Sequence, residues 1–207
     1  MPYECDGDDN ERRWRAGASA GGFRTTIDFG DQKVDIEQVT ASAALGWQRS
    51  PRWGLVLSVG GILGGSVATD AERDVGTGFM GSVTGTWLPV FETDRRPFLL
   101  ASLTFGGAIT TAESDDAMSR RWSALDLRAG LMVGKTLADR FVPFAAVRGF
   151  VGPVSWRLGG QDVTGTDVHK YSVGAGVTLR IPGVLDVFGE ILPLGEQSAS
   201  VGGTVAF

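Results

Sequence analysis

The 207-residue sequence contains a single cysteine and a single histidine. One cysteine excludes an internal disulfide, and one histidine sharply limits any metal site built on imidazole. No run of about 18 apolar residues is present, so no transmembrane helix is expected. The sequence also lacks a phosphate-binding glycine loop, zinc-ligand spacing and a dinucleotide fingerprint, so it predicts neither a cofactor nor a resident metal.

An excess of basic residues is also missing. The formal net charge is −5 and the sequence pI is about 4.9. A nucleic-acid partner requires a basic face, so this balance argues against one. Hydrophobic residues make up 43% of the chain and charged residues 21%, which is typical of a folded protein rather than a disordered one.

Glycine, by contrast, is abundant, with 31 residues among 207, about twice ordinary usage. Residues 1–11 are acidic and nearly free of apolar side chains, which predicts a flexible tail. Residues 12–207 are long enough for one domain, and we expect a single domain there.

Apolar and small polar side chains alternate along most of that domain. The alternation recurs in about ten segments, separated by turn residues. They lie near residues 14–29, 39–47, 53–66, 79–87, 99–110, 125–133, 144–151, 170–180, 185–191 and 198–207. A period of two predicts an all-β protein, and eight strands are possible if two segments are misassigned. The alternation changes phase at Gly21-Gly22, which predicts a β-bulge.

The last segment carries Val201 and Val205 on one face, Ser200 and Thr204 on the other, and ends on Phe207. It resembles the last strand of a bacterial outer-membrane β-barrel. The whole pattern is similar to the small OmpA- and OmpX-like barrel group. The resemblance implies a closed, antiparallel, up-and-down transmembrane β-barrel in the bacterial outer membrane. It also implies that the last strand pairs with the first, and that the barrel-assembly machinery recognises Phe207.

Alternation alone would also fit a soluble barrel of the lipocalin type. The two faces differ, however, because one is mostly Leu, Val, Ala and Ile, and the other mostly Gly, Ser and Thr. An apolar outer face exceeds what soluble monomers tolerate, whereas lipid matches it. Met1 is not preceded by a secretory signal, so we expect the export signal to have been removed. Short turns at one end place both termini and these turns in the periplasm, with the longer loops outside the cell.

Aromatic residues gather near the ends of the predicted strands, where they would form two interfacial girdles. The main girdle residues are Trp14, Trp47, Trp53, Trp87, Phe91, Trp122, Trp156 and Tyr171. Phe29 and Phe79 are also expected in the girdle at the long-loop end.

Charged residues on the small polar face would point into the lumen, where they must pair. This predicted network comprises Asp126, Arg128, Arg148, Arg180, Asp186 and Glu190. It would fill the barrel; the alternative is the filter of a narrow pore.

His169 is the one candidate for catalysis. The stretch His169-Lys-Tyr-Ser172 is similar to outer-membrane lipid A deacylases, which carry a His and a Ser two residues apart on one face. Here the spacing is three, which puts Ser172 on the opposite face and breaks the contact that a base needs with its nucleophile. An interfacial histidine is the favoured interpretation.

Acidic residues are expected to cluster on the outer loops, among them Asp70, Asp74, Asp115 and Asp167. They predict either simple solvation or cation bridging to lipopolysaccharide. The favoured function is a non-enzymatic barrel with a filled or very narrow lumen, in a structural, adhesive or complex-partner role. A narrow pore for small solutes and a lipid A-modifying enzyme are the alternatives. The expected partners are outer-membrane lipid, lipopolysaccharide and an unidentified protein.

Overall fold

A computed structural model describes residues 13–30, 32–68, 72–113, 119–158, 161–181 and 185–207. The predicted tail, residues 1–11, lies outside these residues. The strands are β1 (Trp14–Asp28), β2 (Lys33–Ser50), β3 (Trp53–Ala68), β4 (Glu72–Val75), β5 (Gly78–Val90), β6 (Phe98–Glu113), β7 (Ser119–Gly134), β8 (Phe141–Val151), β9 (Pro153–Leu158), β10 (Gln161–Asp167), β11 (Tyr171–Ile181), β12 (Leu185–Gly195) and β13 (Gln197–Ala206). Within the described ranges, no helix is long and apolar enough to cross a membrane.

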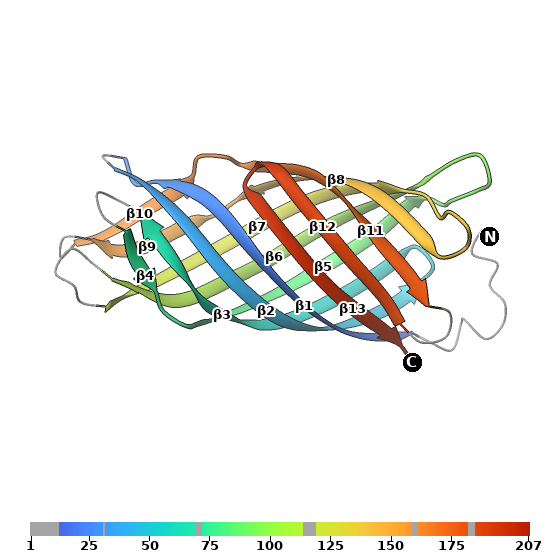
Figure 1. Ribbon diagram of the computed structural model, residues 1–207, viewed down its shortest axis with the longest axis horizontal. Coiled ribbons are helices and arrows are strands. Elements are labelled where there is room, and N and C mark those ends of the chain that lie inside the picture. The colour runs from blue at the N-terminus through green and yellow to red at the C-terminus, as the bar shows by residue number, and fades with distance from the viewer. Residues whose placement is uncertain (1–12, 31, 69–71, 114–118, 159–160, 182–184) are drawn as a thin grey trace.

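These segments form one closed antiparallel barrel (Figure 1). β4 with β5, β8 with β9, and β10 with β11 each continue a single barrel strand across a short irregularity, so the described residues make ten barrel strands. β13 pairs with β1 from Arg15↔Ala206 to Arg24↔Gln197, and beyond that point β1 pairs with β10. The predicted closure and the count of ten are confirmed, and the alternative of eight is excluded.

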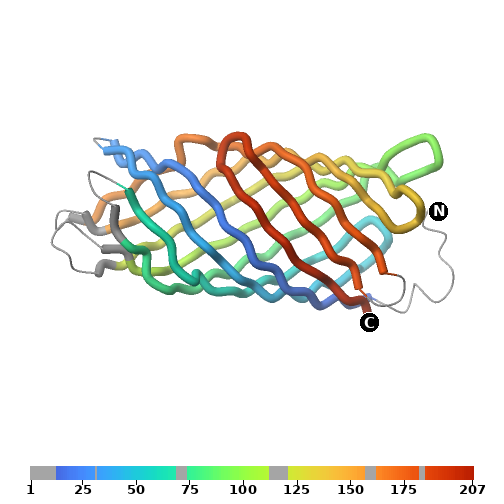
Figure 2. The backbone as a smooth tube through the Cα atoms, in the orientation of Figure 1, coloured from blue at the N-terminus to red at the C-terminus, as the bar shows by residue number. Residues whose placement is uncertain are grey.

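The barrel is elongated, and its two ends differ. β1 begins and β13 finishes at one end, which we call the terminal end, and β4, β9 and β10 lie at the opposite, distal end (Figure 2). The predicted long loops at the distal end are largely strand instead. Glu72–Val75 and Gln161–Asp167 are strands, and β6 and β7 reach Glu113 and Ser119. The sequence predicts loops there because charged and polar residues predominate in these segments.

A belt of apolar side chains surrounds the barrel next to the terminal end. On β2 it spans nine residues, from Val39 to Trp47, whose outward positions are exposed Val, Ala, Leu and Trp. A spanning β-strand needs about 9–11 residues, so the belt has the height of a hydrocarbon layer. The belt also includes Leu57, 51% exposed, and Leu103, 56% exposed, which in water would be strongly unfavourable.

Beyond the belt, the polarity of the two faces is inverted. On β2 the outward residues become Lys33, Asp35 and Glu37, while the inward Val34 and Ile36 are buried. β1 changes in the same way after Gly22, with Arg24 outward and Ile27 buried inside. The predicted β-bulge at Gly21-Gly22 is therefore wrong, because β1 pairs with both neighbours without a register shift there. The phase change marks the boundary between the belt, where the outer face is apolar, and the distal part of the strand, where the outer face is polar.

Candidate functional site

Successive layers of side chains fill the lumen. β7 and the neighbouring barrel strand, formed by β8 and β9, contribute inward side chains to these layers in the same order along their length. From the distal end, the inward residues of β7 are Trp122, then Asp126 and Arg128, then Met132. Along β9 and β8 the order is likewise aromatic and aliphatic, charged, and then apolar. Those residues are Trp156, Val154, Phe150, Arg148, Ala146 and Phe144.

The distal layer, which we call the distal core, is an apolar cluster inside the barrel. Its members are Ile27, Val34, Ile36, Ile62, Val67, Val75, Trp122, Val154 and Trp156, with Phe29 packed against them. Trp122 and Trp156 are 5% and 1% exposed, and their ring centroids lie 5.5 Å apart. Phe29 lies 6.2 Å from each of them. The prediction that these three aromatics form a lipid-facing girdle is therefore wrong. They lie beyond the belt, where apolar side chains turn inward.

The charged layer contains two ion-pair groups. Arg148 donates through Nη2 to Oε2 and Oε1 of Glu190 at 2.6 and 2.7 Å. Arg128 binds Glu196 with two hydrogen bonds, of 2.8 and 3.2 Å, and also donates to Asp126 at 3.1 Å. The Arg128 guanidinium lies 4.4 Å from the centroid of the Phe150 ring. Paired, hydrogen-bonded charges of this kind are what a low-dielectric interior permits.

The structure separates two members of the predicted network from the rest. Arg180 lies opposite Asp186 in the β11–β12 register, but Asp186 pairs with Arg15, with N and O atoms 3.5 Å apart. Sequence reasoning missed Arg15 and Glu196. Arg15 occupies an inward position next to Trp14, so strand parity could have revealed it. Glu196 belongs to the β12–β13 turn, where parity predicts nothing.

Two glycines explain how aromatic rings fit in so narrow a lumen. A Cβ atom added at Gly176 would collide with the ring of Phe144, and one added at Gly202 would collide with the ring of Phe188. Phe144 also packs with Ala146, Leu192 and Met132 in a second apolar cluster on the terminal side of the charged layer.

A cavity of about 410 Å³, which we call the chamber, lies among these layers. Its charged lining residues are Asp126, Arg128, Arg148, Asp167, Glu190 and Glu196, and Phe23, Ile36, Ile62 and Trp122 line apolar parts of its wall. Asp167, predicted on an acidic outer loop, instead lies on β10 and lines the chamber. Its carboxylate accepts hydrogen bonds from the Thr25 hydroxyl at 2.5 Å and from the His169 backbone N–H at 2.8 Å. Burial raises the pKa of Asp167, although these two donors oppose the shift.

The girdle residues near the terminal end do lie on the outer face. Trp14, Trp47, Trp53 and Trp87 are between 37% and 55% exposed. Their rings approach in pairs, with centroids 6.5 Å apart for Trp14–Trp47 and 5.7 Å for the stacked Trp53–Trp87 pair.

Three further aromatics complete the comparison with the predicted sites. Phe91 has the Arg52 guanidinium over its ring at 5.1 Å. Tyr171 is exposed at the distal edge of the belt. Phe207 exchanges backbone hydrogen bonds of 3.0 and 3.3 Å with Trp14, and its side chain remains 59% exposed.

His169 is exposed, and its ring meets the edge of Tyr171 at 6.4 Å. Ser172, by contrast, is fully buried on the inner face, and its hydroxyl has no hydrogen-bond partner among the described residues. The two side chains therefore lie on opposite sides of the barrel wall, so His169 cannot act as a base for Ser172.

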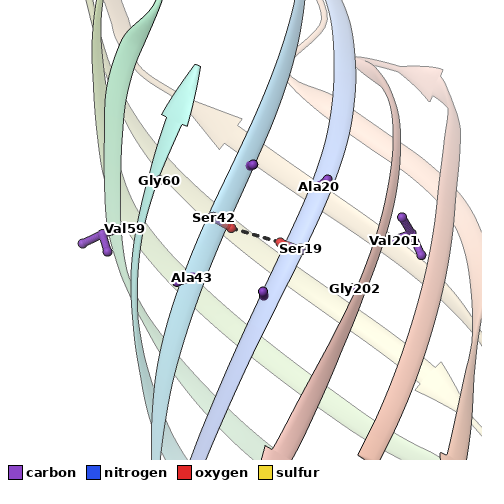
Figure 3. Close-up of a pocket in the computed structure, with 10 residues that line it drawn as sticks. Ser19, Ala20, Ser42, Ala43, Val59, Gly60, Val201 and Gly202 are labelled. Carbon is purple, nitrogen blue, oxygen red and sulfur yellow. Dashed lines mark hydrogen bonds between the residues drawn. The ribbon is translucent and has the colours of Figure 1, made fainter. Parts of the chain in front are cut away.

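The belt also contains a shallow hollow of about 480 Å³ across β13, β1, β2 and β3. Short outward side chains, including Ala20 and Ala43, form its floor, with Val59 and Val201 at its borders (Figure 3). Behind it, the hydroxyls of Ser19 and Ser42 share a 2.9 Å hydrogen bond inside the barrel. Acyl chains of a bilayer would fill such a hollow.

No protein-family model and no curated protein sequence matches the chain. Its fold, however, is similar to solved outer-membrane barrels. The translocator domain of the autotransporter NalP from Neisseria meningitidis matches with a TM-score of 0.60 and 12% identity, over 97% of this chain and 90% of that one. The outer-membrane protease OmpT from Escherichia coli matches with a TM-score of 0.52 and 11% identity, over 94% and 96%. The transport unit of the autotransporter AIDA-I from Escherichia coli matches with a TM-score of 0.52 and 10% identity, over 99% and 93%. The chain thus has the fold of an outer-membrane β-barrel.

Proposed function

We propose that this protein is an integral outer-membrane barrel that does not conduct solutes and that holds a rigid, charged platform above the membrane. The observation that carries this proposal is the inversion of polarity on β1 and β2. Strands of 15–18 residues exceed the height of the belt, and their distal parts enclose an apolar core as a soluble barrel does. The role is structural, adhesive or that of a partner in a complex.

Two layers support a closed lumen. The distal core packs three aromatic rings, with centroids within 6.2 Å of one another, together with buried aliphatic side chains inside the distal end of the barrel. Next to it, two arginines are held by three carboxylates through the ion pairs of the charged layer. Water and ions would have to break both layers to pass.

The platform is the outward face of the distal strands, with Arg24, Lys33, Asp35 and Glu37 among its residues. Arg24 and Asp35 approach to 3.8 Å, and the Thr26 hydroxyl donates to Asp35 at 2.6 Å. A surface built on paired strands is held in place better than a loop, which suits recognition of a protein or of lipopolysaccharide.

Planar-bilayer recording tests closure directly. The full chain, inserted in a bilayer, is expected to show no stepwise conductance, and an open-pore barrel inserted in parallel provides the positive control. Steady ohmic steps from the wild-type protein would overturn the proposal and favour the pore.

Cysteine labelling tests the orientation, with the platform outside the cell and the termini in the periplasm. In a Cys5→Ser background, Glu37→Cys is expected to react with an impermeant maleimide on intact cells, and Asp139→Cys in the β7–β8 turn only after lysis. The reverse pattern would contradict this orientation.

A further inference from the structure

The chamber has more acidic than basic groups on its wall. Four carboxylates and two guanidinium groups line it, for a formal charge of 2 − 4 = −2. Arg148 is already bound to Glu190, and Arg128 to both Glu196 and Asp126. Neither arginine is therefore available as a counter-ion for a further carboxylate.

Asp167 is the carboxylate left over. The donors to it in the structure are neutral, the Thr25 hydroxyl and the His169 backbone N–H. A carboxylate that is half-buried and has no cation beside it is destabilised, which favours uptake of a proton or attraction of a cation. The raised pKa of Asp167, caused mainly by burial, agrees with this deficit of positive charge.

The rest of the wall decides which cation fits. Within the described ranges, no group of three or more His, Cys, Asp or Glu side chains is arranged to hold a metal ion. Much of the wall is apolar instead, with Ile36 and Ile62, and it includes three aromatic rings, those of Phe23, Trp122 and Phe150. Arg128 already lies over the Phe150 ring, so a cation is accommodated on an aromatic face here. The volume of about 410 Å³ falls within the range of small-molecule sites.

Next to the charged layer, but outside the residues that line the chamber, one buried hydroxyl lacks a hydrogen-bond partner in the described part of the chain. Ser172 lies on the inner face as the cross-strand neighbour of Arg148 and Gly195. Its Oγ is fully buried and, among the described residues, has no hydrogen-bond partner. Such groups in native interiors are normally satisfied by water or by a ligand.

We propose that the chamber binds a small organic cation, an amine with an aromatic or aliphatic body, with its ammonium group on Asp167 and its body against the apolar wall. This site is separate from the platform and does not depend on whether the lumen conducts. The proposal predicts that the chamber binds a positively charged ligand more tightly than a neutral or negatively charged one of similar size. Simple partition into detergent would not produce this preference.

Calorimetric titration of the full chain in detergent micelles tests this. The probe is 2-phenylethylammonium, and 3-phenylpropanol and 3-phenylpropionate are neutral and anionic controls of similar size. The amine is expected to bind at least about tenfold more tightly than either control, because a charge-assisted hydrogen bond contributes about 1.5–3 kcal/mol. Equal heats for all three compounds would indicate partition into detergent only and would overturn the proposal.

Two variants locate the site. Asp167→Asn is expected to weaken amine binding about tenfold or more, whereas Glu37→Gln, which removes a carboxylate from the outer face, should leave it unchanged. Ala124→Leu reduces the chamber volume without changing charge, and should abolish binding in protein whose β-sheet circular dichroism is retained. Unchanged amine affinity in either chamber variant would refute the assignment, so the test survives if one of them fails to fold.

Discussion

The Arg148–Glu190 pair offers the sharpest test of how the lumen is stabilised. The carboxylate side chain is 9% exposed and the arginine side chain 27%, and the two are joined at 2.6 Å. Replacing Glu190 by Gln removes the charge but keeps the size, so Arg148 is left in the lumen without its counter-ion. Removing one partner of a buried pair typically costs about 3–5 kcal/mol, and because Arg148 borders the chamber we expect about 2–4 kcal/mol.

Urea unfolding in detergent or lipid vesicles, followed by tryptophan fluorescence, measures this loss. The matched control is Arg24→Gln, which breaks an outward pair at 3.8 Å with exposed side chains and should cost under about 1 kcal/mol. The double variant Arg148→Met/Glu190→Gln should recover part of the loss, because no unpaired guanidinium remains. Equal stability of Glu190→Gln and wild type would refute the ion-pair account of the charged layer.

Three further predictions follow from other layers. Leu57→Arg places a charge at the middle of the belt and should reduce stability in lipid vesicles by about 2–4 kcal/mol. Trp53→Arg at the belt edge should cost about 1 kcal/mol or less beyond the loss of the ring. Equal charge penalties for the two variants would contradict the position of the belt. Trp156→Ala should destabilise the distal core by about 3–5 kcal/mol in the same urea assay, and a loss under 1 kcal/mol would mean that this end is not packed. Asp167, whose folded-state pKa lies above its unfolded value, should lower stability as pH rises from about 4 through its folded pKa. Asp167→Asn should remove that slope from unfolding curves measured between pH 4 and 8, and an unchanged slope would contradict the burial of this carboxyl.

Strand periodicity predicted the architecture because each residue in a barrel wall faces either lipid or lumen. The alternation over 39–47 and 198–207 predicted strands and a belt, the resemblance of the last segment to outer-membrane barrels predicted closure, and these predictions are confirmed. The aromatics near the terminal end also followed from sequence position, because there the outward parity and the belt edge coincide at Trp47 and Trp53.

Beyond the belt the same rule misled. Trp122 and Trp156 stand at strand ends, as girdle residues do, but their side chains are buried inside the barrel. The phase change at Gly21-Gly22 was the available signal. It indicated that the polarity of the inner and outer faces is exchanged there, not that the strand has a bulge.

By itself, the sequence determined the fold, the belt and which side chains point inward within the belt, because these depend on the local period of two. Tertiary structure alone decided which inward charges meet, since Arg128 and Glu196 are 68 residues apart and come together only through barrel closure. It also decided that Asp167 lines a chamber, because strand tilt and the partners of β1 place its carboxylate beside Thr25. Parity gives a direction for each side chain, whereas a contact requires the relative heights of strands that only the closed barrel sets.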